Sequence, residues 1–174
     1  MNLREQLFDA LRGNLVVIGI GNACRGDDAA GSRIVQQIRS LSSVHVIDAQ
    51  EVPENYLCRI AEQRPDTILL IDCVDLKSEP GSVALFDADQ TAAYWPSTHR
   101  VPLSLLVEFL KRTTRARICL IAIQPHQTGF LQAMSAEVLA SVESLADMLN
   151  DILAGRKTSA RADCASPQRG EVLA

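Results

Sequence analysis

The strongest constraint on the fold is the alternation of short apolar runs with helical patterns along the chain. The run at residues 67–72 is apolar on both faces, as in a central strand of a parallel sheet. Further strands are expected over residues 15–20, 44–48, 82–86 and 118–123, and helices over about 28–41, 53–63, 102–111 and 135–153. Strands that alternate with helices through short links predict a three-layer α/β/α sandwich around a mostly parallel sheet.

The length of 174 residues fits one domain. We expect residues 1–155 to form a single α/β domain, which begins with an added amphipathic helix over residues 1–13. Residues 156–174 are polar and basic and have no apolar period, so they are predicted to be a disordered tail. No apolar run approaches the ~18 residues that a membrane span requires.

Composition narrows the partners and the compartment. The formal net charge is −4 and basic residues form no stripe, which argues against a nucleic-acid partner. The five cysteines include no C-x-x-C pair, which is typical of free thiols in a reducing compartment and not of a disulfide frame or a thiolate zinc site. We therefore expect a cytoplasmic monomer that does not associate with membranes.

A glycine-rich turn, residues 19–31, follows the first strand and contains the adjacent carboxylates Asp27 and Asp28. We expect one aspartate to cap the next helix while the other points into the crevice beyond the sheet edge. A dinucleotide-binding turn is excluded, because Cys24 stands where the third glycine belongs. The two carboxylates would also meet the pyrophosphate at the helix N-terminus, so the turn favours a cation instead.

Three polar side chains from separated segments are expected at the carboxyl edge of the sheet: Asp28 or its neighbour Asp27, Asp72, and His99. Two carboxylates and one imidazole suit divalent ions such as nickel, zinc or manganese. Each residue taken alone has an ordinary structural explanation, as a helix cap, a chain turn or a surface histidine. Only their combination indicates a metal site, for which His126 is a weaker second imidazole.

In sequence order, these motifs resemble those of the nickel-iron hydrogenase maturation endopeptidases. The matching segments are Gly19-Ile20-Gly21-Asn22, Gly26-Asp27-Asp28-Ala29-Ala30-Gly31, Asp48 with Pro53-Glu54-Asn55, Leu69-Leu70-Ile71-Asp72, Pro80-Gly81, Thr98-His99-Arg100-Val101-Pro102-Leu103, and Ile123-Gln124-Pro125 with Gly129-Phe130. The resemblance covers about residues 14–153. It is closest to the branch that processes the large subunit of formate-hydrogenlyase-type hydrogenases.

The resemblance implies an aspartyl-type or metal-dependent endopeptidase that acts in the cytoplasm. Its substrate would be a hydrogenase large-subunit precursor, whose C-terminal extension it removes after nickel insertion. Asp28, Asp72 and His99 would be both the catalytic residues and the ligands of nickel, which the precursor presents. The implied sheet is mixed and five-stranded, of order 2-1-3-5-4, with the short fourth strand antiparallel.

The chain departs from the family pattern after the second strand. Relatives usually carry Asp-Gly-Gly there, a segment used in recognising the precursor, whereas this chain has Asp48-Ala49-Gln50. Asp48, Gln50 and Glu54 are therefore the candidate residues for substrate recognition. Two alternatives stay open at this point: a non-catalytic metal-delivery or scaffold module in hydrogenase assembly, and an unrelated metal hydrolase on the same architecture.

Overall fold

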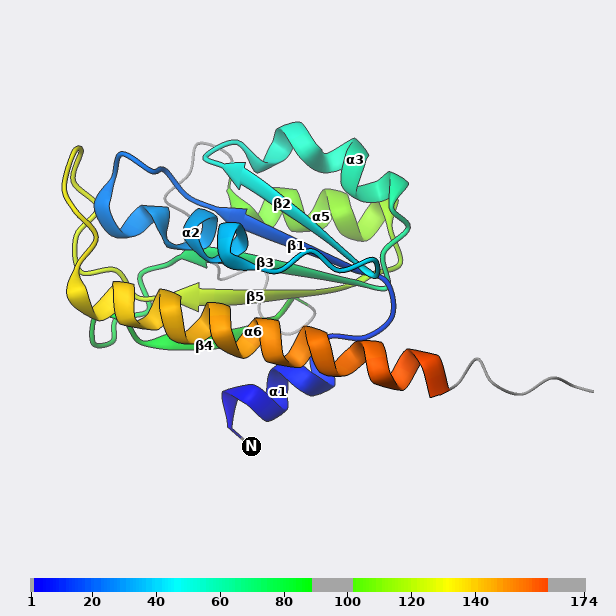
Figure 1. Cartoon of the computed structure of the whole chain (residues 1–174). Helices are drawn as coiled ribbons and strands as arrows, with labels where there is room; N and C mark the ends of the chain where they lie inside the picture. The colour runs from blue at the N-terminus through cyan, green and yellow to red at the C-terminus, as the bar shows by residue number, and fades with distance from the viewer. Residues whose placement is uncertain (1, 89–101, 163–174) are drawn as a thin grey trace, which may run out of the picture.

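A computed structural model describes residues 2–88 and 102–162, with side chains described as far as Arg156 (Figure 1). Its centre is a five-stranded sheet of order β2-β1-β3-β5-β4. The strands are β1 (Leu15–Ile20), β2 (Val44–Gln50), β3 (Thr67–Cys73), β4 (Val83–Asp87) and β5 (Arg117–Ile123). The pairs β1–β2, β1–β3 and β3–β5 are parallel, and β4 is antiparallel to β5. The predicted mixed sheet and its strand order are confirmed.

Helices cover both faces of this sheet, which confirms the three-layer sandwich (Figure 1). One face carries α1 (Leu3–Ala10), α2 (Ala30–Gln37) and α6 (Ala136–Ala162), and the other carries α3 (Leu57–Glu62) and α5 (Leu103–Thr113). Two short 3-10 helices, η1 (Gly26–Ala29) and η2 (Pro53–Tyr56), precede α2 and α3. The predicted helix at residues 53–63 is therefore split into η2 and α3.

The central strands are buried on both faces, and their side chains alternate between two cores. Leu69 and Ile121 pack with α2 and α6, whereas their neighbours Leu70 and Leu120 pack with α3 and α5. A strand covered by helices on both faces must be apolar at every position, which explains the continuous apolar run in β3. Because β1 and β3 are parallel neighbours, both strands end at the same edge of the sheet.

Helix α2 packs on the sheet with almost no separation at its first turn. A Cβ atom at Gly31 would clash with the backbone carbonyl oxygens of Ile20 and Ile71, and one at Gly19 would clash with the carbonyl of Gly31. Only glycine permits so close an approach of helix backbone to strand backbone. The contact fixes the start of α2, and with it the turn of residues 21–29, over the ends of β1 and β3.

Helix α2 ends at Gln37, four residues earlier than predicted, because a side chain of α6 terminates it. Asn150 accepts a hydrogen bond from the backbone N–H of Arg39 (2.8 Å) and donates one to the carbonyl of Gln37 (3.0 Å). The backbone at Ile38 is accordingly extended, with φ −71° and ψ 126°. The apolar period continues past this point, but the tertiary contact decides the helix end.

The prediction that the disordered tail begins at residue 156 was wrong. Helix α6 continues through Gly155 to Ala162, and the guanidinium of Arg156 donates to the backbone carbonyl of Gly13. The rest of the predicted tail, residues 163–174, lies outside the described residues. Although α6 is 27 residues long, neither it nor any other helix in the described ranges is apolar enough over a sufficient length to cross a bilayer.

The predicted N-terminal helix is present, with narrower bounds. Asn2 caps α1 by accepting a hydrogen bond from the backbone N–H of Glu5 (2.9 Å), and the Glu5 carboxylate accepts one from the backbone N–H of Asn2 (3.0 Å). This reciprocal capping box satisfies two backbone donors that would otherwise lack partners at the helix start. Leu7 and Ala10 face the sheet and join the core shared with α6.

Candidate active site

Two of the predicted ligands lie at the carboxyl edge of the sheet, on neighbouring elements. Asp28 belongs to η1, which follows β1, and Asp72 is the sixth residue of β3. The register between the strands pairs Gly19 with Ile71, so Asp72 comes one residue beyond the last β1–β3 pair. Asp72 is completely buried and Asp28 is 5% exposed. The strand order thus brings together two carboxylates that are distant in the sequence.

The thiol of Cys73 lies near the carboxylates of this edge. Burial raises the pKa of Cys73 well above its usual range, and the negative charges of Asp72, Asp28 and Asp27 raise it further. The sulfur also donates a hydrogen bond to the backbone carbonyl of Asp27 (2.8 Å). Cys73 is therefore a neutral thiol whose hydrogen bond links η1 to the end of β3. It is not a candidate nucleophile, because a nucleophilic cysteine needs a lowered pKa.

Asp27 fixes the loop between β5 and α6 to the η1 turn. Its carboxylate accepts hydrogen bonds from the backbone N–H groups of His126 (2.8 Å), Gln127 (2.9 Å) and Ser135 (2.6 Å), and from the Ser135 hydroxyl (3.0 Å). Burial by itself would raise the pKa of Asp27, but these hydrogen bonds outweigh burial and lower it. With four donors already bound to an ionised carboxylate, Asp27 is a structural anchor and a poor candidate for a metal ligand.

Asp28 has a different environment from its neighbour. Its Oδ2 atom accepts a hydrogen bond from the backbone N–H of Asn22 (3.0 Å). The N-cap residue of α2 is Ala29, which makes no side-chain capping bond, and η1 has none either. The prediction that one of the two aspartates caps the helix was therefore wrong, because the η1 turn directs Asp27 towards the β5–α6 loop and Asp28 back towards Asn22.

Asn22 and Ser135 were missed as site residues, although they hold the two aspartates in place. The Asn22 side chain accepts from the backbone N–H of Cys24 (2.8 Å) and donates to the carboxylate of Glu51 (2.6 Å), which ties the turn after β1 to the end of β2. Ser135 is 108 residues away from the Asp27 carboxylate that it binds. No local sequence pattern could have indicated such a distant pairing.

The candidate recognition residues lie in the last part of β2 and in η2. The Asp48 carboxylate accepts hydrogen bonds from the Ser32 hydroxyl (2.7 Å) and the Gln36 side-chain amide (2.8 Å), so it is held against α2. Gln50 is exposed and has a left-handed backbone with φ 51°. Glu54 lies in η2 and is half-buried. Of the three, Gln50 offers the most accessible side chain.

The histidine of the predicted metal set, His99, falls outside the described residues. His126 lies at the same edge, but only its backbone N–H is bound, to Asp27, while the residue as a whole is exposed. Within residues 2–88 and 102–156, no three Asp, Glu, His or Cys side chains are grouped to hold a metal ion. The described part of the edge therefore supplies Asp28 and Asp72, which alone are too few ligands for a closed site.

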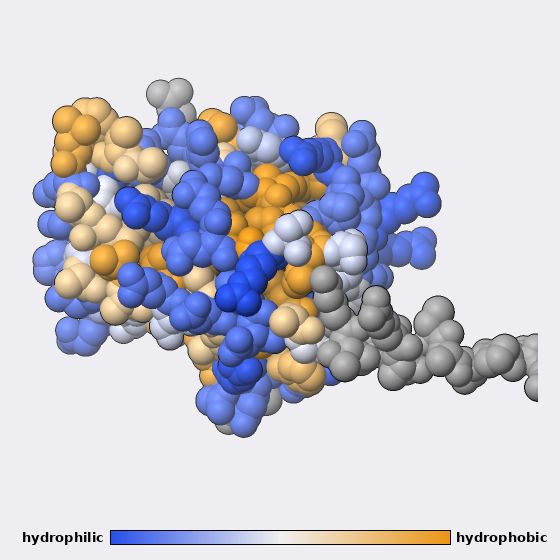
Figure 2. Space-filling model, viewed as in Figure 1, coloured by the Kyte–Doolittle hydropathy of each residue, from blue (hydrophilic) through white to orange (hydrophobic). Residues whose placement is uncertain are grey.

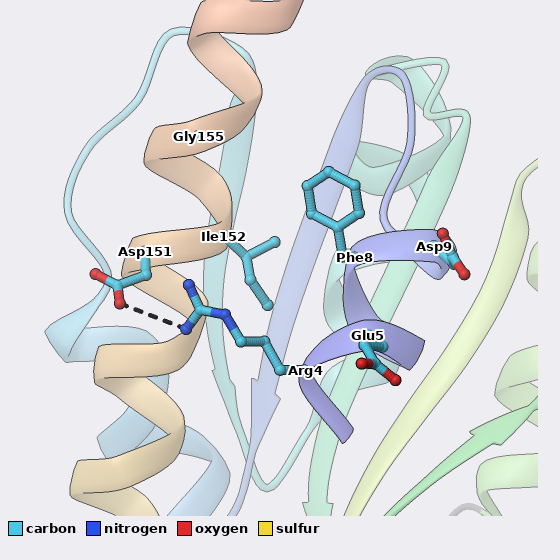
Figure 3. Close-up of a pocket in the computed structure, with 7 residues that line it drawn as sticks. All are labelled: Arg4, Glu5, Phe8, Asp9, Asp151, Ile152 and Gly155. Carbon is cyan, nitrogen blue, oxygen red and sulfur yellow. Dashed lines mark hydrogen bonds and ion pairs between the residues drawn. The ribbon is translucent and has the colours of Figure 1, made fainter. Parts of the chain in front are cut away.

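A pocket of about 490 Å³ lies between α1 and α6 (Figure 3). Its lining residues are Arg4, Glu5, Phe8, Asp9, Asp151, Ile152 and Gly155. Arg4 and Asp151 form an exposed ion pair across it (3.5 Å). Helix α6 starts near the carboxyl ends of the strands and runs towards their opposite ends, where this pocket lies (Figure 1). The pocket therefore does not belong to the candidate active site.

Comparisons by sequence and by structure find the same family of proteins. The HycI model of hydrogenase maturation proteases matches residues 31–152. A relative from Methanocaldococcus jannaschii is 32% identical over 163 residues, which cover 87% of this chain and 96% of the relative. The hydrogenase 3 maturation protease of Escherichia coli K12 is 31% identical over 133 residues, covering 75% and 85% of the two chains. The crystal structure of the NiFe hydrogenase maturation protease HycI from Thermococcus kodakarensis has a TM-score of 0.78 at 31% identity, covering 86% of this chain and 99% of that one.

Proposed function

The chain belongs to the hydrogenase maturation protease family and is therefore a peptidase, and we propose that it removes the C-terminal extension of a nickel-iron hydrogenase large-subunit precursor after nickel insertion. Membership of a peptidase family decides against the two alternatives left open by the sequence, the metal-delivery module and the unrelated hydrolase. The chemistry is the hydrolysis of one peptide bond, which yields a new C-terminal carboxylate and a free extension peptide.

The observation that carries this proposal is the pair of buried carboxylates at the sheet edge. Asp28 and Asp72 come from different elements, and both lie close enough to Cys73 to raise its pKa. Two carboxylates at one edge of the sheet attract a divalent cation. Carboxylate oxygens, joined by an imidazole, are ligands that nickel accepts. These residues therefore fit a divalent ion whose remaining ligands come from the precursor.

We treat the nickel as part of the substrate. Asp28, Asp72 and His99 would bind the nickel that the precursor carries, and would thereby align the peptide bond just beyond the precursor's metal site with the enzyme. Three ligands without a thiolate leave coordination positions open, so the enzyme alone should bind nickel weakly. A precursor without nickel would then lack the group that these residues recognise, and it would escape cleavage.

Recognition of one particular precursor is assigned to the end of β2. Gln50 is exposed beside Glu51, and its backbone is held where the carbonyl of Gln50 accepts from the N–H of Gly21 (2.8 Å). Asp48 supports this arrangement through its hydrogen bonds to α2, and Glu54 lies in η2, which follows β2. We assign the direct contact to Gln50 and the supporting role to Asp48.

The test uses purified enzyme and the nickel-loaded precursor of a hydrogenase large subunit, with precursor mass as the readout. Wild-type enzyme should release the C-terminal extension, and nickel-free precursor should stay intact under the same conditions. Asp28→Asn keeps an oxygen that can accept from Asn22, so its free energy of unfolding should change by less than about 1 kcal/mol. Its cleavage rate should nevertheless collapse, because an amide is a much weaker metal ligand than a carboxylate.

The matched control is Asp147→Asn, which makes the same chemical change at an exposed position on α6. This variant should cleave at the wild-type rate. Rapid cleavage of nickel-free precursor by metal-stripped enzyme in the presence of a chelator would refute the role of nickel. If Asp28→Asn lost stability and activity in equal measure, Asp28 would instead be a structural residue.

A further inference from the structure

Two large apolar side chains project from the loop between β5 and α6, which spans residues 124–135. Phe130 is 67% exposed and its neighbour Leu131 is 76% exposed. The space-filling view shows apolar surface on the end of the molecule where this loop projects (Figure 2). Adjacent exposed residues of this size place a contiguous apolar patch in water, which in soluble proteins commonly marks a binding surface.

The patch is held by hydrogen bonds to the turn that carries Asp27 and Asp28. The backbone N–H of Leu131 donates to the carbonyl of Cys24 (2.7 Å), and the N–H of Asp27 donates to the carbonyl of Gln127 (3.0 Å). The Arg25 guanidinium donates to the carbonyl of Thr128 (3.3 Å). Together with the four hydrogen bonds accepted by Asp27, these contacts fix the loop relative to Asp28.

The conformation of Leu131 has a cost that packing within the chain does not repay. Its φ is 59°, in the left-handed region that a residue with a Cβ atom rarely adopts. The side chain points into solvent, so burial within the fold does not compensate for the strain. Strain of this kind is concentrated at functional and ligand-binding positions.

We propose that Phe130 and Leu131 form a docking contact for the hydrogenase large-subunit precursor. This inference rests on the proposed function, and it assigns the patch an apolar surface of the folded precursor, beside the segment that enters the active site. The patch and Asp28 are attached to the same turn, so a partner that enters the active site also reaches the patch. A protein substrate fits this arrangement, because it can contact both at once. The contact would hold the precursor body while nickel aligns the peptide bond.

The experiment measures both cleavage and binding of nickel-loaded precursor. Phe130→Ser should raise KM, and the dissociation constant measured by surface plasmon resonance, by about tenfold while leaving kcat nearly unchanged, since docking contributes before the chemical step. Leu131→Gly removes the side chain at a position whose φ suits glycine, so the same loss of binding should appear without a lower melting temperature.

The matched control is Phe8→Ser, which removes a phenylalanine of similar exposure (59%) on α1, beside the pocket between α1 and α6. Its KM and dissociation constant should equal those of the wild type. The control separates the effect of this patch from the general effect of removing an exposed aromatic side chain.

Three results would overturn the docking proposal. The first is that the wild-type enzyme cleaves the precursor and the patch variants have unchanged KM and dissociation constant. This result leaves the proposed function intact. The second is a concentration-dependent dimer in sedimentation that Phe130→Ser abolishes, because the patch would then join two copies of this chain. The third is a wild-type enzyme that neither binds nor cleaves the precursor, which refutes the proposed function itself.

Discussion

Substituting Asp27 by asparagine should destabilise the fold far more than the same change at its neighbour Asp28. The Asp27 carboxylate lies completely buried and accepts four hydrogen bonds, of which Oδ2 receives three and Oδ1 receives one, from the N–H of Ser135. An asparagine can keep only one of these oxygens. In its best orientation the carbonyl oxygen replaces Oδ2, and the NH2 group then faces the N–H of Ser135.

The magnitude follows from this geometry. Losing a hydrogen bond to a charged acceptor costs about 1.5–3 kcal/mol, and leaving two buried donors facing one another adds about 1–3 kcal/mol. Asp27→Asn should therefore lower the free energy of unfolding by roughly 2.5–6 kcal/mol. That is a large part of the ~5–15 kcal/mol that stabilises an ordinary domain.

The assay is urea unfolding of the wild type and Asp27→Asn, with Asp147→Asn as the control at an exposed position. The control should stay within about 0.5 kcal/mol of the wild type. The difference between wild type and Asp27→Asn should also depend on pH, because the pKa of Asp27 is lowered from 3.8 in the folded state. A lowered pKa stabilises the fold above the unfolded value, and this stabilisation is lost as the pH falls through the folded pKa.

The difference in stability should thus be full at neutral pH. It should begin to shrink below about pH 4, where the carboxylate of the unfolded chain starts to bind a proton, and continue to shrink as the pH falls through the lower folded pKa. Two results would contradict the anchoring role of Asp27. One is an Asp27→Asn variant within 1 kcal/mol of the wild type at pH 7, and the other is a difference that grows on acidification. Either would mean that the β5–α6 loop is held by contacts other than the ionised Asp27.

Three further substitutions test separate features of the fold by urea unfolding. Gly31→Ala should cost at least ~2 kcal/mol, because its Cβ would clash with backbone atoms of β1 and β3, and a neutral result would show that α2 can move away from the sheet. Gln50→Gly should change stability by less than about 1 kcal/mol, since relief of the φ of 51° offsets the greater freedom of the unfolded chain; a large loss would contradict this balance. Arg156→Ala should lower the free energy of unfolding by about 1 kcal/mol by removing the hydrogen bond to the carbonyl of Gly13, and an unchanged stability would mean that Arg156 does not stabilise the domain.

The strands could be predicted because their residues have little freedom in where they lie, whereas the strand order was predicted from the resemblance to the maturation endopeptidases. A run such as residues 68–71 can be buried only at the centre of a sheet covered on both faces, and the helical patterns between the runs require parallel connections. The position of Asp28 and Asp72 at one edge follows from strand order alone. His99 stays a prediction, since it lies outside the described residues.

Helix ends and side-chain roles were less predictable, since contacts between distant segments decide them. The end of α2 depends on Asn150, which is 111 residues from the backbone group that it accepts from. Without the family resemblance, the sequence could not distinguish the two aspartates, because both lie in the same glycine-rich turn. Their difference arises only when the β5–α6 loop brings its backbone donors to Asp27.

Burial and periodicity act locally and along each strand, so the residue pattern was enough to predict the layers, the parallel sheet and the carboxylates at its carboxyl edge. Folding was needed to make Asp27 an anchor, to bind Asp28 to Asn22 instead of to the start of α2, and to attach the loop with Phe130 and Leu131 to the same turn. The physical reason is that a hydrogen bond depends on the final position of both partners. A carboxylate acquires its role from the donors that the rest of the chain brings to it.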